Sequence, residues 1–212
     1  MSSDLKRLLE SALPPDAEWA SLRRVRTEGR GYQAKDGQFE EAFDYVDEGY
    51  MVEVLHEGQF GYAALASAEP AALKAAAEKA LRLARAAAPR TIHPFGLEVR
   101  PATVARYDTP RKLRAAFGAD LLSRQAIQLT KAMQISGKIV QAAAGIDARD
   151  IEMELVSTSG ASLEQHLHIL GYEVQAIARD GAVTQRRSAN GPRGRNNQGG
   201  WEFLDIAGGE AE

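Results

Sequence analysis

Residues 47–88, DEGYMVEVLHEGQFGYAALASAEPAALKAAAEKALRLARAAA, contain the two signals that decide how the first half of the chain folds. The first signal is Glu57-Gly58, a dipeptide typical of a tight reversal between two extended runs. The second is the alanine-rich run from Glu69 to Ala88, in which Pro70 suits the first helical turn. Apolar residues recur in that run at helical spacing, at Leu73, Ala77, Ala80, Ala84 and Ala87. Because small side chains allow close approach, we predict a helix packed across a β-hairpin.

The residues before this stretch predict a short helix and further strands. Ser3 or Asp4 can cap an amphipathic helix that ends before Pro14-Pro15. From Trp19 to Leu65 the pattern favours extended structure, with Asp36-Gly37 as a second tight turn and Gly49 as a further interruption. We therefore expect an antiparallel meander of about four strands. Its expected buried face consists of Phe39, Tyr45, Tyr50, Val52, Val54, Phe60 and Tyr62.

The second half of the chain repeats this mixture of helix and strands in the opposite order. Residues 91–118 contain several prolines and predict a connector, with a possible short strand at Leu97–Val99. A helix is expected from Ala119 to about Ile135, since its apolar residues share one face and Gly137 can terminate it. Four strands should follow, at residues 138–144, 151–156, 163–170 and 172–178.

The expected fold class is α+β, with two lobes that each pack a helix on an antiparallel meander. The predicted segments are 1–90 for the first lobe, 91–118 for the connector and 119–190 for the second lobe. Residues 191–212 are expected to be a flexible Gly/Arg-rich tail or a junction to a missing catalytic half.

Composition excludes several classes of protein. The chain has 212 residues, no cysteine and a net charge of −3, which excludes thiol catalysis and argues against a dedicated nucleic-acid binder. The start lacks the apolar core of a secretory signal, and no later run is long enough to span a membrane. We expect a cytoplasmic protein.

Charge is distributed unevenly along the chain. No Lys or Arg occurs between Asp36 and Glu69, whereas that stretch is rich in Asp and Glu. Arginines gather near the other end, at Arg179, Arg186, Arg187, Arg193 and Arg195. These charges are solvated faces of strands and a loop, or they form two complementary docking faces.

No catalytic or metal site can be assigned from the residues. His166 and His168 are one residue apart in a strand-like run, but a zinc site needs a further ligand, so we interpret both as solvent-facing. His56-Glu57 begins like a zincin motif and then continues into Gly58, without the second histidine. Phosphate-binding loops and nucleophile signatures are absent from the sequence. Residues 191–200 are similar to arginine–glycine segments that bind RNA, although a flexible loop explains them more simply.

The order of several pieces resembles the opening domain of TldD/PmbA proteins. The pieces are Ala17–Arg23, Lys35–Glu40, Asp47–Leu55 and Glu57–Ala63, followed by the alanine-rich helix. The resemblance covers nearly the whole chain, is strongest from residue 17 to residue 88, and favours the TldD side over the PmbA side.

The resemblance implies a function that the residues alone do not reveal. Family members are cytosolic zinc metalloproteases that act as two-subunit assemblies on unfolded peptides. Their zinc site lies in an H-E-x-x-x-H helix, which this sequence does not contain, so zinc is expected in the missing catalytic half or in a partner. The resemblance thus implies a non-catalytic domain that shapes substrate entry and contributes to subunit contact. Whether the chain is an excised domain or a naturally short protein stays open, as does a stand-alone protein- or RNA-binding module.

Candidate contact residues for a partner or a peptide are Gln175, Arg186, Arg187, Arg193 and Arg195. Gln175 is included because an edge strand within Leu163–Ala178 can accept an extended peptide through main-chain hydrogen bonds. The arginines are included because they suit an acidic partner.

Overall fold

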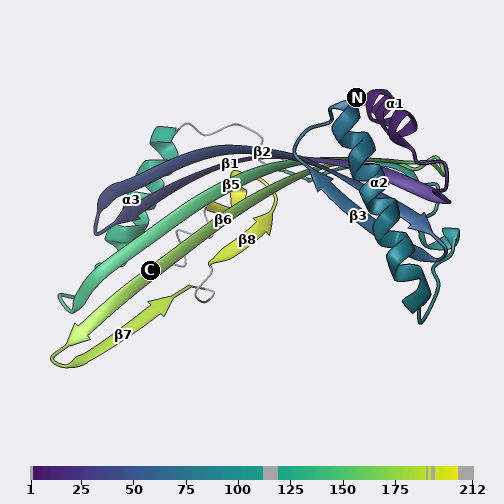
Figure 1. Cartoon of the computed structure of the whole chain (residues 1–212). Coiled ribbons are helices and arrows are strands. Elements are labelled where there is room, and N and C mark those ends of the chain that lie inside the picture. Colours follow the sequence, from purple (N-terminus) through teal and green to yellow (C-terminus); the bar gives the residue numbers. More distant parts are fainter. Residues whose placement is uncertain (1, 112–118, 190, 192–193, 205–212) are drawn as a thin grey trace. The chain divides into compact units, whose positions relative to one another are not determined.

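The computed structural model describes residues 2–111, 119–189, 191 and 194–204. Three helices and eight strands occur in this part of the chain (Figure 1). The helices are α1 (Ser2–Ala12), α2 (Pro70–Ala87) and α3 (Ala119–Ala132). The strands are β1 (Trp19–Lys35), β2 (Gln38–His56), β3 (Gln59–Leu65), β4 (Val104–Asp108), β5 (Ile139–Ser157), β6 (Ser162–Asp180), β7 (Val183–Ser188) and β8 (Arg195–Gln198). Helices on a largely antiparallel sheet confirm the predicted α+β class.

Hydrogen bonds join the strands in the order β3-β2-β1-β5-β6-β4, and β7 and β8 also pair with β6. The chain forms two compact units, each built from three separate segments. Unit 1 contains residues 1–27, 47–108 and 151–166, and unit 2 contains residues 28–46, 109–150 and 167–212. Both units collect segments from both halves of the chain because β1, β2, β5 and β6 each contribute to both. The division along the sequence at residues 90 and 119 stays a prediction.

Two tight turns predicted from sequence occur where they were expected. Asp36 and Gly37 both have positive φ, at 51° and 81°, and they connect β1 to β2. Glu57 and Gly58 have φ of 47° and 73° and connect β2 to β3. Positive φ at both central positions is the geometry that matches the twist of a β-hairpin.

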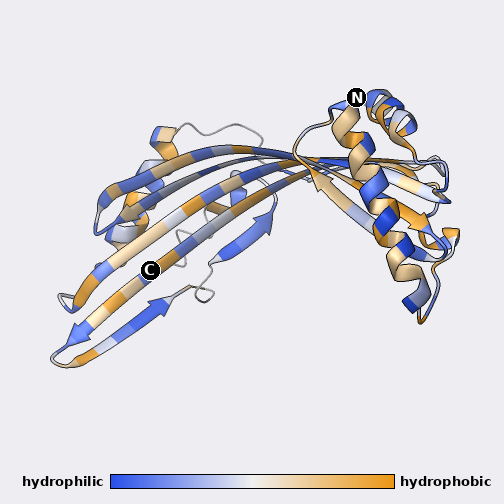
Figure 2. Cartoon of the chain, in the orientation of Figure 1, coloured by the Kyte–Doolittle hydropathy of each residue, from blue (hydrophilic) through white to orange (hydrophobic). Residues whose placement is uncertain are grey.

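Unit 1 has its core between the sheet and helices α1 and α2. Leu73, Ala77, Ala80 and Ala84 of α2 are buried, as the helical spacing predicted. The first three share a cluster with Val52 and Val54 of β2 and Ala63 of β3. Figure 2 shows hydrophilic residues interrupting the outer face of α2. Gly61 of β3 lies so close to α2 that a Cβ there would be 2.7 Å from the Ala84 nitrogen and 2.9 Å from the Ala80 carbonyl carbon. The alanine-rich face and Gly61 together permit this close approach.

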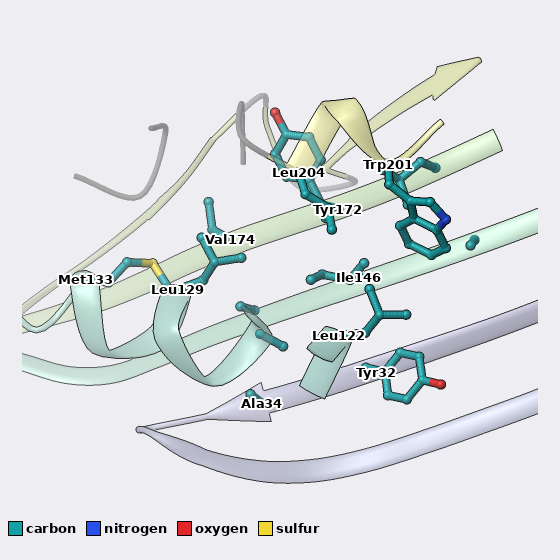
Figure 3. Close-up of a cluster of buried hydrophobic side chains, with 14 of the residues drawn as sticks. Tyr32, Ala34, Leu122, Leu129, Met133, Ile146, Tyr172, Val174, Trp201 and Leu204 are labelled. Atoms are coloured by element: carbon teal, nitrogen blue, oxygen red, sulfur yellow. The ribbon is translucent and has the colours of Figure 1, made fainter. Parts of the chain in front are cut away.

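Unit 2 has its core on one face of its strands, covered by α3 (Figure 3). Leu122 and Leu129 of α3, and Met133 directly after it, pack with Ile146 of β5 and with Tyr172 and Val174 of β6. Trp201 and Leu204 join this core from the C-terminal side. The sequence did not predict β8 or the burial of Trp201 within the segment assigned to a tail or junction. None of the helices described is long and apolar enough to cross a membrane.

Several strand predictions were wrong because glycines lie inside strands. Residues 19–65 form three long strands and not four, since Gly49 continues β2. The two strands expected at residues 138–144 and 151–156 are one strand, β5, which continues through Gly145. The strands expected at 163–170 and 172–178 are likewise one strand, β6, through Gly171.

Other expectations failed in their details. The possible strand at Leu97–Val99 is a 3-10 turn, and the strand of this region is β4, which runs parallel to β6. Of the face expected to be buried in the first meander, only Val52 and Val54 are fully buried. Phe39 and Tyr45 are exposed, because β2 has no covering layer from Gln38 to Asp47. Tyr62 of β3 is exposed because it lies between Gly61 and Ala63, which face α2, and so points away from that helix.

Candidate functional site

The predicted contact residues lie at different places in unit 2. Gln175 lies in β6 and pairs with Ser188 of β7. Arg186 and Arg187 lie on β7, where every residue from Val183 to Arg187 is exposed. Arg195 begins β8, and Arg193 lies outside the described residues. The structure therefore brings Gln175 near the β7 strand that carries Arg186 and Arg187.

β6 is not the edge strand that the peptide hypothesis requires. One side of β6 pairs with β5, and its other side pairs in turn with β4, β8 and β7. The residues opposite β7 run from Gln175 to Asp180, so a peptide cannot add to the edge there. The placement of an open edge within Leu163–Ala178 was wrong, because the chain itself supplies the neighbouring strands.

A pocket of about 330 Å³ lies on the face of unit 2 opposite α3. The alternation of residues along a strand identifies this face. Ile146 and Tyr172 point into the core beneath α3, so the adjacent positions Gly145 and Gly171 face the other side of the sheet. Gly29 and Gly31 of β1 lie on the same face. A Cβ at Gly29 would overlap the Tyr45 ring, and a Cβ at Gly31 would overlap the Phe43 ring. Neighbouring side chains fill the space above these glycines: Tyr45 at Gly29, Phe43 at Gly31, Glu173 at Gly145 and Asp147 at Gly171.

Phe43 and Tyr45 of β2 form the aromatic wall of this pocket. The Phe43 ring lies over Gly31 and the Tyr45 ring lies over Gly29. The two rings are stacked, with centroids 6.5 Å apart and an interplanar angle of 21°. Both side chains are exposed, Phe43 by 38% and Tyr45 by 42%, so each ring keeps a free surface. They form an aromatic platform that a flat or apolar group can contact.

Charged side chains line the other side of the pocket. The Arg149 guanidinium donates to Oδ1 of Asn196 at 2.8 Å and pairs with Asp147, whose Oδ2 lies 3.2 Å from its Nε. Glu173 and Arg195 complete the charged lining. The pocket therefore combines an aromatic wall with charged side chains of both signs.

His168 is the polar residue of unit 2 that sequence reasoning placed wrongly. It is only 6% exposed, and its Nδ1 lies 2.6 Å from Oδ1 of Asp150. Its backbone nitrogen donates to the hydroxyl of the fully buried Thr109, and its ring contacts Trp201 edge-on. Its Nε2 is buried without a hydrogen-bond partner among the described residues. His168 therefore links β6 to Thr109, which follows β4, and to Trp201, which follows β8.

The error for His168 has a physical reason. From the sequence alone, the apolar residues Leu163, Leu167 and Ile169 favour a buried face that places the two histidines on the solvent side. β6 continues without a break to Tyr172 and Val174, and these even-numbered residues point into the core. His166 is exposed, as predicted, because it lies before the part of the strand that α3 covers.

The hydrogen bond with His168 also affects Asp150. That bond lowers the pKa of the Asp150 carboxyl, and the charges of His168, Arg111 and Arg30 lower it further, against the opposing effect of burial. The carboxylate form is therefore the one that the fold stabilises.

Unit 1 contains a second charged cluster, centred on Arg24. The guanidinium binds Glu48 through two hydrogen bonds of 2.9 and 3.2 Å and Glu154 through one of 3.1 Å. Tyr50 donates to the same Glu48 carboxylate at 2.7 Å. These bonds raise the pKa of Arg24 and lower that of Glu48, so both groups stay charged. We interpret the cluster as structural, because each charge is satisfied within it.

No metal site is found in the described residues. No three His, Asp or Glu side chains there lie close enough together to hold an ion. His166 and His168 do not form a pair, since one is exposed and the other is bound to Asp150.

The sequence and the fold both have known relatives. Residues 20–84 match the family model described as PmbA/TldA metallopeptidase domain 1. None of the curated proteins matches the chain in sequence. The fold resembles a candidate modulator of a DNA gyrase from Thermotoga maritima, with a TM-score of 0.66 and 15% identity, over 100% of this chain and 48% of that one.

Two further structures share the fold. TldE from Thermococcus kodakarensis has a TM-score of 0.57 and 13% identity, over 99% of this chain and 46% of its own. A candidate gyrase modulator from Bacteroides thetaiotaomicron has a TM-score of 0.57 and 14% identity, over 88% of this chain and 43% of its own. The chain thus spans about half the length of the structures it matches. The preference for the TldD side stays a prediction. The match of residues 20–84 to the first domain of the PmbA/TldA family and the fold shared over the whole chain both support an amino-terminal domain of the TldD/PmbA type.

Proposed function

We propose that the chain is the non-catalytic amino-terminal domain of a TldD/PmbA-like zinc metalloprotease. The observation that carries this proposal is the match of residues 20–84 to the first domain of the family, within a fold that extends over the whole chain. The relatives of known structure are about twice as long, which leaves room in such proteins for a separate catalytic half.

In this proposal the zinc is held outside the chain, by the catalytic half or by a partner subunit. The lack of a three-ligand cluster in the described ranges is consistent with that assignment. The chemistry of peptide hydrolysis then belongs to the other half, where zinc activates a water molecule. The residues of this chain position the peptide and exclude bulky folded substrates.

The pocket of unit 2 supports a role in guiding unfolded peptide. The Phe43–Tyr45 wall can contact apolar side chains without selecting one sequence, and the charged residues beside it can contact polar groups of the peptide. A protease for unfolded chains needs contacts of this tolerant kind. We further propose that the assembly works in the cytoplasm and that this domain contributes to contact between two different subunits.

Reconstitution tests the proposal directly. The chain is assayed alone and together with a family polypeptide that contains the H-E-x-x-x-H helix, using an unstructured fluorogenic peptide and metal analysis after chelation and zinc reloading. We expect cleavage only in the mixture and no stoichiometric zinc in the chain alone. The matched control replaces the glutamate of that motif by glutamine, which should abolish cleavage without affecting assembly.

Two results would contradict the proposal. The first is cleavage by the chain alone. The second is one tightly held zinc per chain that is lost in the variant His166→Ala, since that would establish a metal site here. Tight binding of RNA or of a protein, with no effect on any H-E-x-x-x-H half, would favour the stand-alone module instead.

A further inference from the structure

The first half of β2 is an open edge of the sheet in unit 2. β3 pairs with β2 only from Tyr50 to His56, so in the described part of the chain residues 38–46 pair with β1 alone. Figure 1 shows β2 at one margin of this unit. All ten residues from Gln38 to Asp47 are exposed, which means that no described side chain or helix covers the edge. Its outward backbone N–H and C=O groups are available to another strand.

Of the usual protections of natural edge strands, this edge has charged side chains alone, at Glu40, Glu41 and Asp44. Charges, lysine above all, as well as proline, a bulge or a very short length normally prevent such an edge from pairing with a foreign strand. Residues 38–46 contain neither lysine nor proline, and they expose Phe39, Phe43, Tyr45 and Val46. Figure 2 shows hydrophobic and hydrophilic residues along this part of β2. Exposed apolar residues without lysine or proline favour pairing of this edge with another strand.

Its charge is of one sign. Glu40, Glu41 and Asp44 are exposed and have no ion pair or hydrogen bond with any described residue. No Lys or Arg occurs from Asp36 to Glu69, so the segment has no basic residue of its own to neutralise them. A strand that adds here would meet three uncompensated carboxylates, which favours basic and disfavours acidic residues in it.

The rings of Phe43 and Tyr45 do not lie over the open edge. They lie over Gly31 and Gly29 of β1, on the other side of β2. A strand that adds to the edge therefore contacts these two side chains near their base and leaves the ring faces free.

We propose that residues 38–46 are a docking strand for an extended, basic segment of another protein chain. The segment adds to the β2 edge through main-chain hydrogen bonds and places lysine or arginine against Glu40, Glu41 and Asp44. This inference rests on the edge and its charges, and it does not depend on the protease assignment.

Peptide binding to the whole chain tests the proposal. The probes are three fluorescein-labelled peptides as long as the edge: one alternating lysine with valine and phenylalanine, one with glutamate for each lysine, and one with proline at alternate positions. Fluorescence anisotropy should give an affinity for the basic peptide about tenfold higher than for the acidic one, since the lysines of one face lie opposite Glu40 and Asp44 and two cross-strand charge pairs change sign. The proline peptide should bind at least about tenfold more weakly than the basic peptide, because proline at alternate positions removes every second main-chain donor.

Charge reversal on the protein makes the test specific. The variant E40K/E41K/D44K should prefer the acidic peptide over the basic one. The matched control E10K/E78K/E98K changes the net charge equally at exposed positions of unit 1 and should keep the original preference. Hydrogen exchange should show slower exchange of amides in residues 38–46 when the basic peptide is bound.

Three outcomes would overturn the proposal. One is equal binding of the proline peptide, since the contact would then not use main-chain hydrogen bonds. Another is a reversal of preference in the control variant, which would indicate a general charge effect. The third is self-association of the chain that the variant R186E/R187E abolishes and the basic peptide competes with, because a second copy would then occupy the edge through β7.

Discussion

Gly61 offers the sharpest test of how unit 1 is held together. A Cβ at this position would lie 2.7 Å from the Ala84 nitrogen and 2.9 Å from the Ala80 carbonyl carbon, and closer still to the Ala80 oxygen. These atoms belong to the backbone of α2, which cannot rotate away as a side chain can. An ordinary contact of 3.4 Å instead of 2.7 Å requires the helix to recede from the sheet by at least 0.7 Å.

That displacement has a cost that can be estimated. The buried face of α2 includes Leu73, Ala77 and Ala80, all at 1% exposure or less, so a retreat of the helix opens the whole contact. Overpacking of a core costs about 1–3 kcal/mol, and a rigid backbone obstacle belongs at the upper end of that range. We expect Gly61→Ala to lower the free energy of unfolding by about 3 kcal/mol, or the melting temperature by about 6–12 °C.

Gly49 provides a matched control within the same hairpin. It also lies inside a strand, but the nearest atom to its added Cβ is the Leu65 carbonyl oxygen at 3.8 Å. Gly49→Ala should therefore leave stability unchanged or raise it by about 0.5–1 kcal/mol, because alanine has less freedom in the unfolded chain. Thermal unfolding followed by circular dichroism measures both. If Gly61→Ala unfolds within about 1 kcal/mol of Gly49→Ala, the close helix–sheet contact is not what stabilises this unit.

Three further substitutions test the charged clusters and the strand pairing. Arg24→Met should lower the free energy of unfolding by about 2–3 kcal/mol, because Glu154 then stays buried without its cation. Adding Glu154→Gln should restore part of the loss. Urea unfolding of both variants measures this, and no recovery of stability in the double variant would contradict it. Asp150→Asn should cost about 1 kcal/mol at pH 7, a value reduced by the partial exposure of the carboxylate. The lowered pKa of Asp150 stabilises the fold above its ordinary value of 3.8, so the difference from wild type should shrink as the pH falls below that value, and a constant difference would refute the assignment. Gln175→Pro should destabilise unit 2 by about 2–3 kcal/mol more than Thr184→Pro, since β6 is paired on both sides and β7 is an edge; equal hydrogen exchange in the two variants would contradict this.

Local signals predicted the helices and the tight turns well. Each of the two helices α1 and α2 begins and ends within about two residues of its expected limits, because proline and capping residues act through local geometry. The same holds for Asp36-Gly37 and Glu57-Gly58, whose positive φ only a few residue types adopt readily. These features need no information from distant parts of the chain.

Strand length could not be predicted in the same way. Gly49, Gly145 and Gly171 suggested interruptions, yet each lies inside a strand. The reason is tertiary: a Cβ at Gly171 would overlap Asp147 of the neighbouring strand, so this glycine makes room for another side chain and does not turn the chain. A single sequence does not distinguish these two uses of glycine.

The candidate site was harder still, because it depends on which strands are neighbours. The sequence identified Arg195 as a contact residue, and the structure places it in the lining of the unit 2 pocket. It did not reveal Phe43 and Tyr45 as an exposed platform, since aromatic residues in a strand usually point into a core. Their exposure follows from the glycines of β1, on which the two rings lie.

The margins of unit 2 follow from two hairpins that the sequence does reveal. β1 pairs with β5, so the turn at Asp36-Gly37 can only place β2 on the outside. β6 also pairs with β5, so the turn after Asp180 places β7 on the opposite margin (Figure 1). The acidic segment of the chain therefore lies on one margin and Arg186 and Arg187 lie on the other. A net charge of −3 conceals this separation. Because like charges opposite one another destabilise strand pairing, a basic strand that adds to β2 is disfavoured at β7, and the two edges must select different partners.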